Sequence, residues 1–174
     1  MRLNLIAALN NQGAIGANGE MLWHHTDMPS DMKYFRDITR GHIVIMGRKT
    51  WDSLSVQPLP NRINIVISTT LGAVKSPWVY VVSGIEEALE LAKQLTEKAD
   101  DKNVFCIGGG TLYHALINIA DALWLTHVFM DAEGDTYFPP LDERDWKTDH
   151  LSNLPIISGK DKYPFTFKYY SRIR

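Results

Sequence analysis

Val104-Phe105-Cys106-Ile107-Gly108-Gly109-Gly110-Thr111 is an apolar stretch that runs directly into three glycines. We predict a buried strand followed by the first turn of a helix, where exposed backbone N–H groups can hold a phosphate. His42-Ile43-Val44-Ile45-Met46-Gly47-Arg48-Lys49-Thr50 has the same order of elements, with two cations and a hydroxyl after its glycine. Two turns of this kind in one α/β domain predict an extended cofactor with more than one phosphate group.

Neither turn matches a standard nucleotide-binding motif. Tyr113 stands where G-x-G-x-x-G requires its third glycine, and no G-K-[ST] follows the glycines. For residues 47–50 taken alone, a surface helix start with solvated cations is the favoured interpretation. The glycine run at 108–110 is harder to explain that way, because glycine costs backbone entropy and adds no packing.

Strands and helices are predicted to alternate along the rest of the chain. The predicted strands cover residues 3–9, 42–46, 63–67, 79–82, 104–107, 122–128, 146–151 and 165–172, and the predicted helices cover 29–40, 85–98, 111–119 and a short segment ending at 54. This alternation is typical of an α/β protein, and the last two strands lack a helix between them. We therefore predict a single domain over residues 1–174. It has a central, mixed, mostly parallel eight-stranded sheet, an antiparallel C-terminal strand and about four helices on both faces.

Composition narrows the class of protein. The chain has 174 residues, 45% of them hydrophobic, and a net charge of −2, so charge gives no reason to expect nucleic acid or an anionic membrane as a partner. Its single cysteine, Cys106, excludes an internal disulfide and fits a reducing compartment. No signal peptide or membrane-spanning run is visible in the sequence. We expect a cytoplasmic protein.

Asp31 is the most unusual carboxylate of the sequence. The helix predicted from Pro29 places Asp31, Phe35 and Ile38 on one face, and we expect Met32 and Phe35 to make that face apolar. A carboxyl group in an apolar pocket has a raised pKa and is suited to proton transfer. The alternative is a first-turn acid that interacts with the helix dipole, and the stretch alone favours that alternative.

The sequence leaves two possible roles for each of several other candidate residues. Ser68 and Thr69 either bind phosphate or end a strand, Arg62 either pairs with a carboxylate or is solvated, and Thr126 is either strand filler or part of a site. His24, His25, Asp27 and Asp31 suggest a metal site, but a histidine-bearing loop is the better interpretation and no metal is expected. Cys106 is expected to be a small core residue. Residues 10–20, with three glycines, form either a mobile lid or a plain connection.

Taken in order, these segments resemble the dihydrofolate reductase family in its bacterial form. The resemblance is carried by residues 5–8, 15–16, 23, 31–35, 44–53, 58–62, 64–68, 107–110, 113, 125–127 and 133–139. It implies an enzyme that transfers hydride from NADPH to C6 of 7,8-dihydrofolate and protonates N5, giving tetrahydrofolate for one-carbon metabolism. It also implies a monomer and binding of antifolates such as trimethoprim or methotrexate.

The resemblance assigns roles on the substrate side. Asp31, supported by Thr126, would bind the pterin amino and ring N–H groups and promote protonation of N5, and Trp23 would anchor a water nearby. Arg62 would bind the glutamate α-carboxylate, a task that suits guanidinium. The implied catalytic residues are Asp31, Trp23 and Thr126, and the implied substrate contacts are Ile6, Ala7, Asp31, Phe35, Leu54, Arg62, Ile107, Tyr113 and Thr126.

On the cofactor side, the resemblance implies that the pyrophosphate binds at the turn after Gly108, whose peptide bond to Gly109 is cis. Arg48 and Lys49 would contact the 2′-phosphate, and residues 14–21 would close over the nicotinamide. The implied cofactor contacts are Ala8, Ile15, Gly16, Gly47, Arg48, Lys49, Thr50, Ser68, Thr69, Gly108, Gly109, Gly110, Thr111, Leu112 and Tyr113.

The sequence departs from the family pattern at three places. Leu22 stands where proline commonly precedes the tryptophan, the segment from Trp23 to Asp31 is longer than the usual W-x-x-P-x-D, and Thr111 stands where a basic residue could contact phosphate. Two alternatives remain beside the first interpretation. One is a reductase of the same fold that acts on another pterin or a pyrimidine, and the other is a folate- or nucleotide-binding module without activity.

Overall fold

The computed structural model describes residues 1–99, 101–150 and 154–173. Its elements in chain order are β1 (Leu3–Leu9), β2 (Ala14–Gly16), α1 (Pro29–Thr39), β3 (Ile43–Gly47), α2 (Arg48–Ser53), β4 (Ile63–Ile67), β5 (Val79–Val82), α3 (Ile85–Glu97), β6 (Val104–Cys106), α4 (Gly110–Leu116), β7 (Ala122–Val128), β8 (Thr136–Tyr137), β9 (Trp146–His150) and β10 (Phe165–Arg172).

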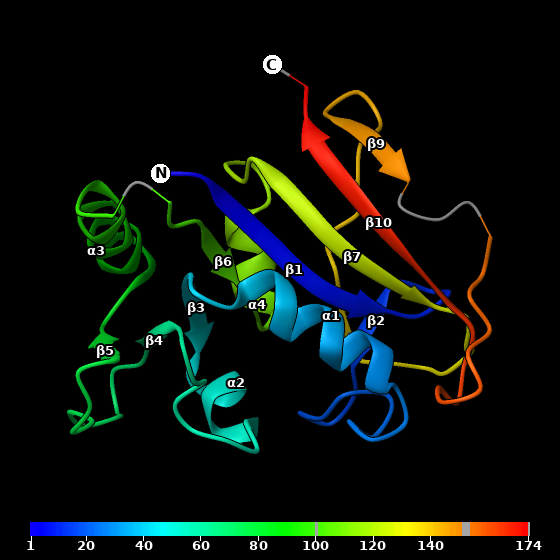
Figure 1. Cartoon of the computed structure of the whole chain (residues 1–174), viewed down its shortest axis with the longest axis horizontal. Coiled ribbons are helices and arrows are strands. Elements are labelled where there is room, and N and C mark those ends of the chain that lie inside the picture. The colour runs from blue at the N-terminus through cyan, green and yellow to red at the C-terminus, as the bar shows by residue number, and fades with distance from the viewer. Residues whose placement is uncertain (100, 151–153, 174) are drawn as a thin grey trace.

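Eight of these strands form one sheet, in the order β5-β4-β3-β6-β1-β7-β10-β9 (Figure 1). Every neighbouring pair from β5 to β7 is parallel, and β10 runs antiparallel to both β7 and β9. The predicted mixed, mostly parallel sheet with an antiparallel C-terminal strand is therefore confirmed, as are the four helices of the described part of the chain. No helix among the described residues has the length and apolarity needed to span a membrane.

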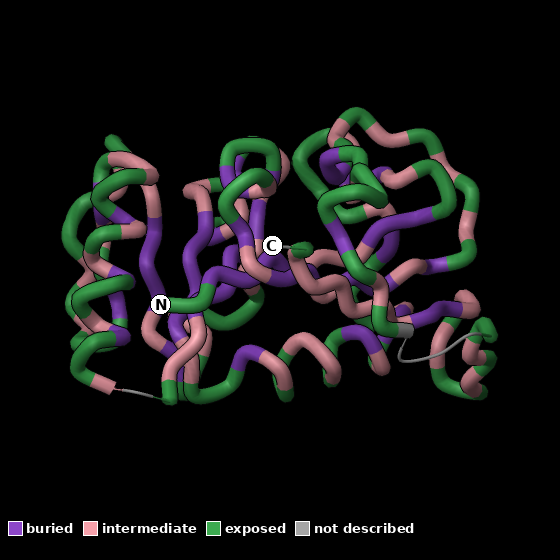
Figure 2. Tube along the Cα trace, turned by 90° about the horizontal axis from the view of Figure 1, so that it is seen from above, coloured by how far each residue is buried: buried purple, intermediate pink, exposed green. Residues whose placement is uncertain are grey.

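The two faces of the sheet carry different helices because successive strand residues point to opposite sides. One hydrophobic cluster combines Leu3, Leu5 and other strand residues with α3 and α4, and Ala88, Ala92, Leu91 and Leu95 of α3 belong to it as predicted. The opposite cluster combines Ile6, Val44 and Met46 with Trp51 of α2 and with Phe35 and Ile38 of α1. Buried strands accordingly lie between α1 on one side and α4 on the other (Figure 2).

The sheet order brings the two glycine turns together. β3 and β6 are parallel neighbours, with Ile45 opposite Cys106, so their carboxyl ends meet at one edge of the sheet. The Gly47 N–H donates to the Gly108 carbonyl at 2.9 Å, which joins the turn before α2 to the turn before α4. The cis peptide bond expected between Gly108 and Gly109 is present.

The structure corrects three details of the sequence prediction. Residues 10–20 are not a plain loop, because β2 lies within them and pairs antiparallel with β8; strands of two and three residues are too short to show periodicity. α4 ends at Leu116 and not at the predicted residue 119. Directly after Leu116, the Ile117 carbonyl accepts a hydrogen bond from the Arg172 guanidinium. Met32 does not join the buried face of α1: it is 37% exposed, one residue and about 100° around the helix from Asp31. The predicted strand end at 151 lies outside the described residues.

Candidate active site

Asp31 faces the interior of the protein, at the third residue of α1. Its side chain is buried, and its residue is only 8% exposed. Burial raises the pKa of this carboxyl to about 6; a hydrogen bond with buried Thr126 of β7 acts in the opposite direction, and the negative charge of Asp161 raises it further. The predicted inward position is confirmed, and Asp31 is at the same time an acid in the first turn of α1, so its burial is what distinguishes it. The carboxyl is poised to change protonation state close to neutral pH.

The residues predicted to surround the substrate lie on both faces of the main sheet. Ile6, Phe35, Leu54 and Ile107 lie together in the cluster on the α1 side of the sheet. Ala7 instead packs against the α4-side cluster, because it alternates with Ile6 along β1.

The predicted aromatic partner of Asp31 is buried beside the start of α1. Trp23 is 6% exposed and packs with Met28 and Phe165, with Ala8 against the same group. Trp23 is thus held between the segment before α1 and the start of β10. Trp23 thus lies in the loop before α1 and Thr126 in β7, both beside the first turn of α1 that carries Asp31.

Arg62 is buried at the C-terminal end of α1, with two of its donor groups already held. Its Nε donates to the Pro60 carbonyl at 2.9 Å, and one terminal nitrogen donates to the Thr39 hydroxyl at 3.0 Å. The guanidinium also lies 5.9 Å above the ring of Phe35. Burial, followed by the charges of Arg36 and Arg40, lowers its pKa. Among the described residues Arg62 makes no ion pair with a carboxylate, so the positive charge is available to a ligand.

The turn that carries Arg62 is shaped by Asn64, which is completely buried in β4. The Asn64 side chain accepts from the Leu59 N–H at 2.9 Å and donates to the Leu59 and Arg62 carbonyls, both at 3.1 Å. Thr39 is likewise fixed, since its hydroxyl donates to the Phe35 carbonyl at 2.8 Å. No sequence pattern predicted these two supporting residues, because their partners depend on the folded turn.

The glycines at the two turns leave room that side chains would fill. A Cβ on Gly109 would lie 3.7 Å from the Thr50 hydroxyl, which places Thr50 beside the triple-glycine turn. A Cβ on Gly110 would lie 2.6 Å from the Thr136 methyl group and 3.8 Å from Ile15. Gly108 has a φ of +113°, a conformation that disfavours any side chain. The predicted cofactor residues from β2, α2 and α4 therefore converge on one backbone-lined cradle.

Replacing Gly110 by alanine is expected to destabilise the protein by about 1–3 kcal/mol, because the new methyl group must displace Thr136 of β8. Urea unfolding measures this change. Gly72→Ala is the matched control, since a Cβ there meets nothing within 4 Å. Equal unfolding free energies for the two variants would contradict the close packing of β8 over this turn.

The two cations after Gly47 have different charged neighbours. The Arg48 Nε lies 2.9 Å from both carboxylate oxygens of Asp52, and its NH1 lies 3.4 Å from the Thr70 hydroxyl. Lys49 acts on Asp135, whose pKa is lowered first by hydrogen bonds from Asn18 and Thr136 and lastly by the charge of Lys49. Arg48 is thus held between Asp52 of its own helix and Thr70, which follows β4.

A hollow of about 590 Å³ adjoins the Arg48 side of the turns. It is bounded by the carboxyl end of β4, the edge strand β5 and the start of α3, and includes Ser68, Thr69, Tyr80 and Glu87. The Ser68 and Thr70 hydroxyls lie 3.4 Å apart at its rim. The predicted adenosine-end residues therefore lie beside a real depression next to Arg48.

The glycine-rich segment after β1 is fixed against the residues before β8. The Asp135 N–H donates to the Gly16 carbonyl at 3.0 Å, and the Asn18 N–H donates to the Asp135 carboxylate at 2.7 Å. Because Ile15 also lies near Gly110, this segment covers the edge where the cradle opens. Asp135 was not among the predicted site residues.

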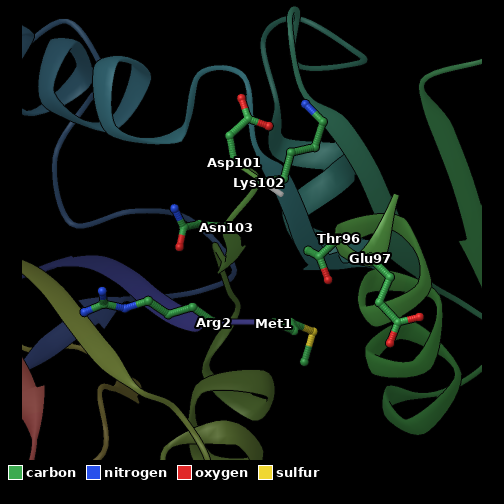
Figure 3. A pocket seen from close by; sticks show the side chains of 7 residues that line it. All are labelled: Met1, Arg2, Thr96, Glu97, Asp101, Lys102 and Asn103. Atoms are coloured by element: carbon green, nitrogen blue, oxygen red, sulfur yellow. The ribbon is translucent and has the colours of Figure 1, made fainter. Parts of the chain in front are cut away.

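A second hollow, of about 490 Å³, lies at the opposite edge of the sheet, where β1 and β6 begin. Its charged side chains do not converge on one point: in Figure 3 Arg2 and Glu97 extend to opposite sides, and Asp101 and Lys102 both extend away from them. Lys102 donates to the Gly41 carbonyl and Arg2 to the Tyr169 hydroxyl, so both cations are already bound elsewhere. This hollow has no feature of a catalytic centre.

The histidines of the longer segment before α1 lie at the surface. The rings of His24 and His25 are 4.2 Å apart, and Asp27 lies 3.6 Å from the Lys162 ammonium. No group of three metal-ligating side chains was found among residues 1–99, 101–150 and 154–173. The segment that carries His24, His25 and Asp27 is therefore a surface loop, which contacts Lys162 in the chain before β10.

Comparison with known proteins identifies the family. The sequence profile described as "Dihydrofolate reductase" matches residues 2–172. The dihydrofolate reductase of Neisseria meningitidis serogroup B is 36% identical over 165 residues, 95% of this chain and 96% of the relative. That of Bacillus subtilis is 34% identical over 170 residues, 98% and 94% of the two chains.

A solved structure agrees with these sequence comparisons. The dihydrofolate reductase of Enterococcus faecalis, complexed with NADP(H) and RAB-propyl, superposes with a TM-score of 0.79 at 30% identity, covering 99% of this chain and 97% of the other. The matched region includes both glycine turns, the helix of Asp31 and the turn of Arg62. This chain belongs to the dihydrofolate reductase family.

Proposed function

We propose that the chain reduces 7,8-dihydrofolate to 5,6,7,8-tetrahydrofolate with NADPH, and that Asp31 is the residue on which proton delivery depends. The observation that carries this proposal is the buried carboxyl of Asp31, whose pKa is raised to about 6 without a cation among its causes. In the reaction, C6 of the pterin gains a hydride and N5 gains a proton, so the N5=C6 double bond becomes a single bond. A protonated or readily protonated carboxyl beside the pterin favours the second of these events.

On the substrate side, Asp31 would accept hydrogen bonds from the pterin amino and ring N–H groups, and Thr126 would hold its carboxylate in place. Ile6, Phe35 and the other apolar residues of the α1-side cluster would exclude water from the ring. Arg62 would bind the glutamate carboxylate with the N–H groups that Pro60 and Thr39 leave free. This separates the two charged recognition points by the length of α1, as a long substrate requires.

On the cofactor side, the residues fit a dinucleotide phosphate. NADPH supplies the hydride when it is bound. The cradle formed by Gly47, Thr50 and residues 108–110 offers backbone without side chains to a pyrophosphate, and a side chain at Gly110 would clash with Thr136. Arg48, with the hollow that contains Ser68 and Thr69, would hold the 2′-phosphate and adenosine.

The contact of Arg48 with Thr70, beside the hollow that contains Ser68 and Thr69, predicts that Arg48 contributes to cofactor choice. Arg48→Ala is expected to reduce the preference for NADPH over NADH by roughly 10- to 100-fold, the effect of losing one charge-assisted contact. Lys49→Ala is the comparison variant and is expected to change this preference less, because Arg48 is the cation that reaches Thr70 beside the hollow. The ratio of kcat/KM values for the two cofactors measures the effect. Equal ratios in wild type and Arg48→Ala would remove Arg48 from the 2′-phosphate site.

An absorbance assay of NADPH oxidation tests the proposed function directly. Oxidation that depends on added dihydrofolate supports it. No turnover with dihydrofolate, together with tight NADPH binding, would instead favour a binding module. Turnover only with another pterin or with a pyrimidine would favour a related reductase of the same fold, although the buried Arg62 is suited to the carboxylate of folate.

We further propose that residues 1–174 act as one functional domain, that the enzyme is monomeric and cytoplasmic, and that antifolates such as trimethoprim or methotrexate occupy its pterin site. The family match over residues 2–172 supports the first point. The free, buried Cys106 fits a reducing compartment. Light scattering of the purified protein tests the oligomeric state.

A further inference from the structure

The loop before β10, residues 156–165, is hydrogen-bonded to the beginning of α1. The Asp161 carboxylate accepts from the Ser30 N–H at 2.8 Å and also from the Ser30 and Ser158 hydroxyls. One residue further on, the Lys162 N–H donates to the Asp27 carbonyl at 2.8 Å. In Figure 1 this orange loop lies at the end of the molecule where α1 begins. Two neighbouring residues of one loop therefore hold the segment that leads directly into Asp31.

The loop is itself anchored. Ile156 and Phe165 form an antiparallel bridge, with N–H to carbonyl distances of 2.7 and 3.2 Å, which closes the loop at its base. Within it, the Asp161 N–H donates to the Ser158 hydroxyl at 3.1 Å. The position of Asp161 is consequently fixed from both directions.

Asp161 supplies a cap that α1 lacks in its own sequence. The N-cap residue Met28 makes no side-chain capping hydrogen bond. A carboxylate that accepts from a first-turn N–H satisfies a donor without an intrahelical partner and interacts favourably with the helix dipole. Because Ser30 directly precedes Asp31, this cap also sets a second carboxylate close to the first.

We propose that Asp161 is a positioning residue of the reduction, which holds the first turn of α1 through Ser30 and so fixes the place of Asp31. The inference rests on the proposed role of Asp31. It assigns a function to the longer segment before Asp31 and to the loop that holds it, neither of which is explained by substrate or cofactor contacts.

The surroundings of Asp31 agree with this assignment. Burial is the largest cause of its raised pKa, and Asp161 adds to it, whereas Thr126 opposes it. Among the described residues, Tyr34 and Tyr113 are the other titratable groups that interact with Asp31, and burial raises their pKa values to about 12 and well above 10. Both phenols stay neutral near pH 7, so Asp161 is the charged neighbour that acts on Asp31.

Asp161 remains ionised over the range in which Asp31 titrates. Burial acts to raise the pKa of Asp161, but hydrogen bonds from Ser158 and Ser30 and the charge of Lys160 lower it overall. Removal of this charge should therefore lower the pKa of Asp31, and the loss of protonated Asp31 should begin at a lower pH.

Asp161→Asn tests the inference, because the amide keeps the shape and the serine hydroxyls can accept as well as donate. The titration of Asp31 is followed by carboxyl ¹³C NMR, with its signal identified by its absence in Asp31→Asn. The midpoint is expected to move to lower pH, and the single-turnover rate at pH 8 to fall roughly two- to fivefold, with little change at pH 5. Asp142→Asn, which removes an exposed carboxylate paired with Arg144, is the matched control and should change neither quantity.

A second variant keeps Asp161 and its hydrogen bonds. Gly159→Lys adds a cation beside Asp161 at a position where a Cβ meets nothing within 4 Å, and the Asp31 midpoint should again move to lower pH. Unchanged midpoints in both variants would overturn the inference, even with Asp31→Asn inactive. Near-normal turnover of Asp31→Asn would instead overturn the proposed role of Asp31, whatever the midpoint does.

Discussion

Replacing Asp31 by asparagine is expected to lower turnover at pH 7 by at least about 100-fold, the effect typical of losing a positioned acid or base. Asparagine has nearly the same shape and can still accept a hydrogen bond from Thr126, but it cannot supply or favour a proton. Steady-state NADPH oxidation with saturating dihydrofolate measures the loss. Asp142→Asn, remote and exposed, is the control and should keep full turnover.

The same substitution is expected to make the unliganded protein more stable. The pKa of Asp31 rises from an ordinary value of 3.8 to about 6 in the folded state, so its ionisation opposes folding. Below pH 3.8 this cost is absent; it grows as the pH rises to 6 and then stays constant at about 3 kcal/mol. Asp31→Asn should therefore exceed wild type in unfolding free energy by up to about 3 kcal/mol at pH 8, and by much less at pH 4.

Urea unfolding at the two pH values distinguishes this account from a structural role for Asp31. A variant that is inactive and destabilised at pH 8 would mean that the carboxylate holds the fold together. A variant that is inactive and more stable at pH 8 is the expected result, because the buried charge then serves catalysis at the expense of stability.

Replacing Arg62 by leucine is expected to weaken dihydrofolate binding by about 3 kcal/mol, roughly 100-fold, while NADPH binding changes by less than about twofold. The guanidinium is buried and lacks a carboxylate partner among the described ion pairs, so loss of its charge leaves the glutamate of the substrate unpaired. Fluorescence titration with each ligand measures the two constants. Equal losses for both ligands would contradict the assignment.

Dihydropteroate, which lacks the glutamate, sharpens this test. It should bind the wild type about as weakly as dihydrofolate binds Arg62→Leu, and the substitution should affect its binding little. Arg62→Lys keeps the positive charge but loses the several N–H groups with which the guanidinium reaches Pro60, Thr39 and the ligand at once. This variant should therefore bind dihydrofolate with an affinity between those of wild type and Arg62→Leu. Arg144→Leu, an exposed arginine elsewhere, is the control.

Local patterns were sufficient for the main sheet and the helices, whereas the inward position of Asp31 was decided by the family resemblance of the whole chain, because the stretch alone favoured a first-turn acid. Apolar strands followed by glycine are signals within a few residues, and the spacing from Asp31 to Phe35 and Ile38 fixes a helix face. The same reasoning misplaced Met32, because a residue adjacent to a buried position on a helix lies at the rim of the buried stripe.

Contacts between distant segments were not predictable. Asp161 reaches Ser30 across 131 positions, and β2 pairs with β8 across more than a hundred residues, with only two or three residues in each strand. Those contacts decide how the site is held.

The pH dependence of the single-turnover rate of NADPH oxidation, compared between wild type and Asp31→Asn, tests the central role of Asp31 most directly. In wild type the rate should be highest below the pKa of about 6 and fall about tenfold per pH unit above it. In Asp31→Asn it should be low and lack this transition. A rate in the variant that is near normal, or that keeps the wild-type transition, would contradict the account.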